Sequence, residues 1–219
     1  LDGESGKWLE LPRDTNSLIR CRDIALENGA TLFQRHEWLA SSNGKIYISE
    51  TGNVQFDWTR RILGGAVPAK HFLDHFHLGS NVFSDVHGRI LEFDPATNKM
   101  RSYLEGGIDE ADSATILSNP DGNAIQTFDG VDYLIINEDI DWFDRGRVPE
   151  YVTAAQRFIN EVYFLPLNKQ EPQRSDLMRF AIGPKGSETT GTYFTPDGKT
   201  MFLNIQHPWP RNKPPFNRS

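Results

Sequence analysis

Three stretches of the sequence carry strong β-hairpin signals, and each returns through a strand that ends in polar residues. Their turns are Asn43-Gly44, Asp129-Gly130 and Pro196-Asp197-Gly198, each between runs rich in Ile, Tyr, Thr or Phe. Asn-Gly and Asp-Gly favour tight hairpin turns. In the third turn, Pro presets φ, Asp bonds to nearby backbone and Gly accepts a positive φ. The sequence therefore predicts a chain built from antiparallel hairpins.

A second kind of hairpin alternates with these three. It is predicted over residues 88–104, with its turn at 94–98, and again over residues 161–180. Units of four strands separated by turn signals are typical of propeller blades. The predicted fold class is all-β, an incomplete β-propeller of roughly two and a half four-stranded blades with long irregular loops and short helices. Closure takes about four blades or more, so a partner segment or protein is expected to complete it.

Weaker patterns predict the remaining segments. We expect a strand over 6–11, a helix over 18–28 that stops at Gly29, irregular structure over 51–84 and some helical character over 152–158. Residues 1–208 form the predicted part-propeller, and residues 209–219 form a Pro-rich extended tail.

Composition limits the classes of function. The net charge of −7 over 219 residues disfavours a general nucleic-acid binder and suits a site that collects cations. No apolar run approaches the eighteen or so residues that a membrane span needs. The single cysteine, Cys21, excludes an internal disulfide. The first residues show neither a start Met nor a signal-peptide pattern, so we expect a processed chain.

Several motifs occur in one order along the chain. They are Gly29-Ala30-Thr31, Arg35-His36-Glu37-Trp38, Pro120-Asp121, Glu138-Asp139, Gly183-Pro184, Glu188-Thr189-Thr190-Gly191 and Thr195 through Pro208. Together they resemble the PhoX-type alkaline phosphatase family over roughly residues 6–208, and the last is the most specific match. Departures are His36 in place of the family's Pro, Gly122 where Asn is usual, and no match to the motif that supplies a cysteine thiolate, which Cys21 lies outside.

The resemblance implies a six-bladed propeller that hydrolyses phosphomonoesters with calcium and iron in an axial pocket. It also implies export through a twin-arginine signal to the periplasm or cell exterior, with an organelle lumen as the alternative. No nucleic acid and no membrane span are expected.

Carboxylates from separate loops are the candidate metal ligands, because hard cations such as Ca²⁺ take six to eight oxygen ligands. They are Glu37, Asp121, Glu138, Asp139 and Glu188. Salt bridges or solvated strand ends are the alternative for each, and the resemblance favours Glu37 and Glu188. The predicted catalytic residues are Arg35, Glu37 and Glu188. Arg35 could hold a phosphate in bidentate fashion or pair with Glu37. Gln206 and His207 are the other candidates for binding substrate.

Two functions stay open at this point. The chain could contribute a metal-dependent phosphatase site completed by further blades, or it could be a non-catalytic, propeller-derived binding or structural subunit of a larger assembly. Whether it is an enzyme on its own is left undecided. The role of His71, His75 and His77 is also open, between a metal site on a helix and a packed loop.

Overall fold

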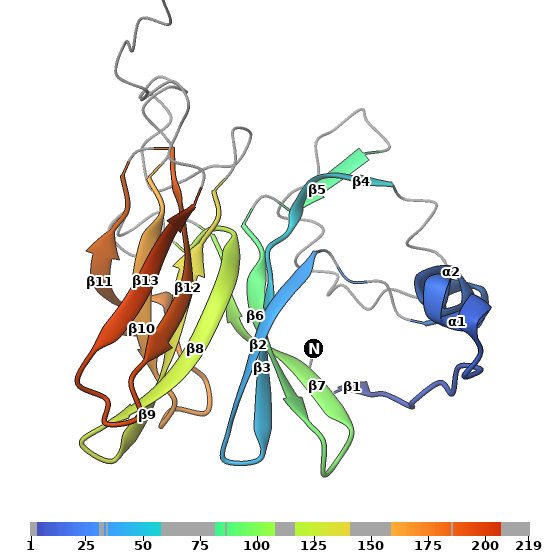
Figure 1. Ribbon diagram of the computed structural model, residues 1–219, viewed down its shortest axis with the longest axis horizontal. Helices are drawn as coiled ribbons and strands as arrows, with labels where there is room; N and C mark the ends of the chain where they lie inside the picture. The colour runs from blue at the N-terminus through green and yellow to red at the C-terminus, as the bar shows by residue number, and fades with distance from the viewer. Residues whose placement is uncertain are drawn as a thin grey trace, which may run out of the picture.

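The computed structural model describes residues 4–30, 33, 35–57, 82–85, 87–107, 117–140, 159–184 and 186–206 (Figure 1). Antiparallel strands dominate this part of the chain, and its helices are few and short. The predicted all-β class is confirmed. No helix among these residues is long and apolar enough to cross a membrane.

The first large sheet has five strands in the order β1-β7-β6-β3-β2. They are β1 (Glu4–Ser5), β2 (His36–Ser42), β3 (Lys45–Glu50), β6 (Arg89–Asp94) and β7 (Lys99–Glu105). β2, β3, β6 and β7 form a meander in chain order, and β1 extends it at the outer edge. A separate pair, β4 (Asn53–Asp57) and β5 (Val82–Asp85), lies between β3 and β6 in sequence.

The second sheet repeats the meander, and a single hairpin follows it. The sheet has the order β11-β10-β9-β8, and β12 pairs with β13. The strands are β8 (Pro120–Phe128), β9 (Val131–Glu138), β10 (Glu161–Pro166), β11 (Met178–Ile182), β12 (Glu188–Phe194) and β13 (Met201–Gln206). Two four-stranded meanders and a two-stranded hairpin match the predicted strand order. Their assembly into a propeller stays a prediction.

The hydrophobic core lies between the two large sheets. Tyr47 and Ile90 from the first sheet belong to the same buried cluster as Leu134 and Leu165 from the second. Apolar faces of two antiparallel sheets pack in this way when strands alternate inward and outward residues. On the far side of the second sheet, Phe128 contacts Phe194 of β12 edge-on, with ring centroids 5.8 Å apart. The strands β2, β3, β6 and β7 thus form a first unit, β8–β11 a second and β12–β13 a third, and the first and third units both pack against the second. Figure 1 shows the first and second units next to each other.

The tight turns form as the sequence predicts. Asn43 and Gly44 have φ of 49° and 74°, and Asp129 and Gly130 have φ of 49° and 78°. Two successive positive φ angles are the signature of the type I′ hairpin turn. In the third turn Gly198 has φ of 67°, and Asp197 accepts a hydrogen bond from the Lys199 backbone N–H at 3.1 Å.

Substituting Gly44 tests the first turn. Gly44→Ala places a Cβ on a left-handed residue that has open space around it, so we expect the free energy of unfolding to fall by about 1–2 kcal/mol from backbone strain alone. Gly44→Asn should cost less, because Asn tolerates this conformation. Chemical denaturation of both variants checks the difference, and equal losses would contradict the turn assignment.

Three local predictions are wrong. Residues 6–11 form no strand, because Gly6 and Trp8 bond to the backbone and side chain of Asn98 at the β6–β7 turn. The predicted single helix is two, α1 (Thr15–Ile19) and α2 (Cys21–Glu27), because Arg20 leaves the helical conformation at φ −106°, ψ 21°.

The segment 51–84 is not wholly irregular, since β4 and β5 pair within it. The expected helical character of residues 152–158 and the extended tail at 209–219 lie outside the described residues.

Candidate active site

A β-bulge near the start of the first strand of each unit sets the aim of the side chains there. In β2 the register shifts between His36 and Leu39, so Glu37 lies in the bulge. In β8 it shifts between Pro120 and Asn123, so Asp121 takes the corresponding place. The bulge of β12 follows Thr190, and Glu188 begins that strand. Bulges bend a strand and re-aim side chains, which suits a functional rim.

The backbone that leads into the first two bulges also repeats. Arg35 and Asn119 have φ of 56° and 50°, uncommon values for residues other than glycine. The carbonyl of Arg35 accepts from the Thr51 N–H at 3.0 Å, and the carbonyl of Asn119 accepts from the Asp139 N–H at 2.9 Å. Left-handed residues of this kind concentrate at functional sites. Arg35 in the first unit thus corresponds to Asn119 in the second, and Thr51 corresponds to Asp139. Arg35 and Asp139 lie at the same rim.

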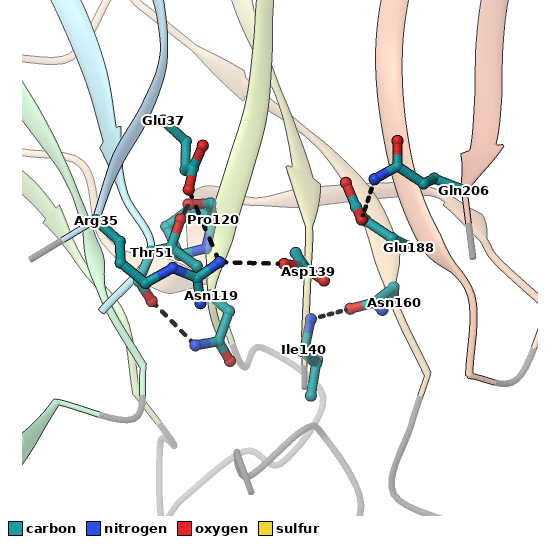
Figure 2. A network of polar contacts seen from close by, with 10 residues as sticks. All are labelled: Arg35, Glu37, Thr51, Asn119, Pro120, Asp139, Ile140, Asn160, Glu188 and Gln206. Carbon is teal, nitrogen blue, oxygen red and sulfur yellow. Dashed lines mark hydrogen bonds and ion pairs between the residues drawn. The ribbon is translucent and has the colours of Figure 1, made fainter. Parts of the chain in front are cut away.

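Arg35 connects carboxylates from two units. Its Nη2 lies 3.4 Å from Oδ2 of Asp139 and 3.7 Å from Oε1 of Glu37 (Figure 2). The side chains of Arg35, Glu37 and Asp139 are 39%, 36% and 24% exposed. Ion pairs this long and this open to solvent contribute little stability. The guanidinium is therefore accessible to a ligand at small cost.

Asp121 and Glu188 lie deeper, at 7% and 9% exposed. The pKa of Asp121 is raised to about 7, first by burial and then by the charges of Glu37, Asp139 and Glu188, against the lowering effect of Arg35. The pKa of Glu188 is raised to about 6, first by burial and then by the charge of Asp139, while the hydrogen bond from Gln206 Nε2 at 3.0 Å opposes the rise. The structure thus brings four carboxylates and one arginine into one electrostatic cluster.

Glu138 is placed differently from the other candidates. Its side chain is 2% exposed. Its Oε1 accepts from the Ser118 N–H at 2.8 Å, and its Oε2 accepts from the Glu161 N–H at 3.0 Å. Both oxygens are therefore engaged in holding neighbouring backbone. His207 and the three histidines of residues 71–77 lie outside the part of the chain that the structure describes.

The cluster offers oxygen donors, which are the ligands that calcium takes. Cys21 is exposed on α2 and is no member of it. Among the residues described, no three His, Cys, Asp or Glu side chains converge closely enough to hold a metal ion. The donor types fit a hard cation, while the coordination sphere is not assembled by these residues alone.

Sequence reasoning missed two buried asparagines that bridge the units. Asn119 Nδ2 donates to the carbonyl of Thr51 at 3.0 Å (Figure 2). Asn160 Nδ2 donates to the carbonyl of Ser187 at 2.7 Å. The Asn119-Pro120 dipeptide is a turn signal that could have drawn attention to the first. No local pattern marks the second.

Comparison with known proteins gives one result for nearly the whole chain. The family model described as alkaline phosphatase PhoX matches residues 2–209. Searches of curated proteins and of solved structures found no match.

Proposed function

The chain belongs to the PhoX alkaline phosphatase family, and on this premise we propose that its carboxylate cluster takes part in the hydrolysis of phosphomonoesters. One observation carries the proposal. Three separate hairpins deliver Glu37, Asp121 and Glu188 to one rim, where Asp139 and Arg35 join them. The like charges of this cluster raise the pKa of Asp121 and of Glu188. Such repulsion favours a site that binds cations, since a bound cation relieves it.

Arg35 is proposed to bind the phosphate of the substrate. Its guanidinium can donate two parallel hydrogen bonds to phosphate oxygens, which are stronger than its long contacts to Glu37 and Asp139. Gln206 keeps Glu188 in place through their hydrogen bond. His207 is proposed to bind substrate beside it.

The proposed metal ligands are Glu37, Asp121, Asp139 and Glu188. Of these, Glu37 and Glu188 are also the proposed catalytic residues. Glu138 is left out, because its oxygens already hold backbone N–H groups. Bound cations would polarise the phosphoryl group and supply a nucleophile from water. Oxygen donors support calcium, and iron is proposed from the family alone.

The part-propeller is proposed to be completed by a further segment or protein. Support comes from the strands of the described residues, where two units have four strands in meander order and the third has two. The apolar side chains of Phe202 and Ile205 in β13 are 56% and 40% exposed, so a further segment could cover them.

The family context supports export to the periplasm or cell exterior, with an organelle lumen as the alternative.

A second candidate function is a non-catalytic binding or structural subunit. The observation that favours it is that the described carboxylates do not converge into a metal-holding group.

Metal analysis and an activity assay separate the two candidates. The purified chain would be analysed for bound metal by mass spectrometry and assayed on p-nitrophenyl phosphate with and without chelator. Bound calcium or iron and chelator-sensitive turnover are expected. A folded sample with neither would contradict the phosphatase proposal and favour the structural subunit.

Arg35→Lys tests the phosphate-binding role. Lysine keeps the charge but loses the paired donors, so we expect KM for p-nitrophenyl phosphate to rise about tenfold with a smaller change in kcat. Arg20→Lys is the matched control, because Arg20 is also half exposed and contacts two carboxylates, Asp23 and Glu27. Equal kinetics for both variants would remove Arg35 from the substrate site.

A further inference from the structure

We propose that Asn160 is a positioning residue that fixes the separation of Asp139 and Glu188 across the junction between the second and third units. The inference rests on the proposed function, because it matters only if these two carboxylates act on a common ligand. It assigns to Asn160 a role that no sequence pattern indicates.

The side-chain amide of Asn160 bonds to the neighbours of both carboxylates. Its Oδ1 accepts from the backbone N–H of Ile140 at 2.6 Å (Figure 2). Its Nδ2 donates to the carbonyl of Ser187 at 2.7 Å. Ile140 directly follows Asp139, and Ser187 directly precedes Glu188. One planar group thus connects the backbone that carries the two acids.

Asn160 is itself held firmly. The residue is 2% exposed, and its backbone carbonyl accepts a hydrogen bond from the Gly183 N–H at 2.7 Å. Next to it, Thr189 Oγ1 lies 3.3 Å from the carbonyl of Glu138 and 3.2 Å from that of Glu161. The amide therefore acts from a fixed point, as a residue that orients others must.

The bridge opposes an electrostatic force. Asp139 and Glu188 interact as like charges when both are ionised, so the two acids repel each other. Without a tie between their backbones, repulsion favours a wider spacing. A cation that binds both acids must bring them together, and Asn160 supplies that arrangement in advance.

The other junction is tied in a similar way, which argues against an accidental contact. Asn119 donates to the carbonyl of Thr51 at 3.0 Å, and Thr51 Oγ1 donates to the carbonyl of Pro120 at 2.9 Å. Pro120 directly precedes Asp121. At both junctions, a buried asparagine bridges the units beside a carboxylate of the cluster.

The test compares Asn160→Ala with a control at the same junction. Thr192→Val removes a buried hydrogen bond between the same two units, from Thr192 Oγ1 to Asn137 Oδ1 at 3.0 Å, without touching the backbone beside Asp139 or Glu188. Calcium affinity of the full chain would be measured by calorimetry at a temperature where every variant is folded. Hydrogen exchange of the Ile140 amide reports the bridge directly.

We expect Asn160→Ala to weaken calcium binding by about 10- to 100-fold, the usual effect of losing a partner that orients ligands, and to speed exchange at Ile140. Thr192→Val should leave both unchanged. Asn160→Ser serves if the alanine variant does not fold. Calcium affinities that are equal for the Asn160 variants and wild type overturn the positioning role alone. A wild-type chain that binds no calcium overturns the proposed function, and the inference with it.

Discussion

Glu50→Gln is expected to lower the free energy of unfolding by about 3–5 kcal/mol, the usual cost of removing one partner from a buried ion pair. Glu50 and Arg89 are 1% and 0% exposed, and Arg89 Nε lies 2.5 Å from Oε2 of Glu50 across the β3–β6 pair. Glutamine keeps the shape but removes the carboxylate charge that pairs with the buried guanidinium. Arginine cannot release its own charge by losing a proton.

Urea denaturation of the variant and its controls measures this effect. Glu92→Gln breaks a similar pair with Arg101, but those side chains are 12% and 28% exposed, so a loss of about 1 kcal/mol or less is expected. The double variant Glu50→Gln/Arg89→Met should recover most of the stability, because it also removes the buried guanidinium charge. A double variant as unstable as Glu50→Gln would contradict the electrostatic explanation.

The strands and turns were predictable because their signals are local. Asn43-Gly44 and Asp129-Gly130 demand positive φ wherever they occur, and the flanking alternation fixes the strands on either side. The bulges were not predictable. Glu37-Trp38 and Asp121-Gly122 share only an initial acid. Each bulge depends on pairing with the far end of the next strand, near Glu50 for β2 and near Glu138 for β8.

The adjacent acids Glu138 and Asp139 show the limit of prediction at the site. Both are predicted metal ligands from the sequence. However, consecutive side chains at a strand end point to different sides of the sheet. Glu138 turns inward to the N–H groups of Ser118 and Glu161, and Asp139 turns outward to Arg35. The role of Asn160 was even less predictable, because its hydrogen-bond partners lie 20 and 27 positions away along the chain.

Asp121→Asn is expected to stabilise the metal-free protein at pH 8 and to make its stability less dependent on pH. The pKa of Asp121 rises from its ordinary 3.8 to about 7 on folding. Between these values the folded state binds more protons than the unfolded state, so stability falls as pH rises from about 4 to about 7. A shift of this size sets an upper bound of roughly 4 kcal/mol, which solvent screening at the rim lowers, and asparagine removes this contribution.

Denaturation at pH 5 and pH 8 in the presence of chelator measures how the free energy of unfolding changes with pH. Asp132→Asn is a control of opposite sign, because hydrogen bonds from Ser42 and Thr127 lower the pKa of Asp132. That substitution should destabilise the protein at pH 8. If wild type and Asp121→Asn have the same slope, Asp121 does not titrate in this window.

Calcium should reverse the effect of Asp121→Asn, and this reversal connects the stability of the cluster to its proposed use. A cation bound among Asp121, Asp139 and Glu188 favours their ionised forms, so it removes the repulsion that destabilises the free protein at pH 8. Saturating calcium should then raise the unfolding free energy of wild type more than that of the asparagine variant. A gain of equal size in both would place the cation away from Asp121. A group of acids that lowers stability without calcium and restores it with calcium has the property expected of a binding site. A set of acids that served only the fold would show no such dependence on calcium.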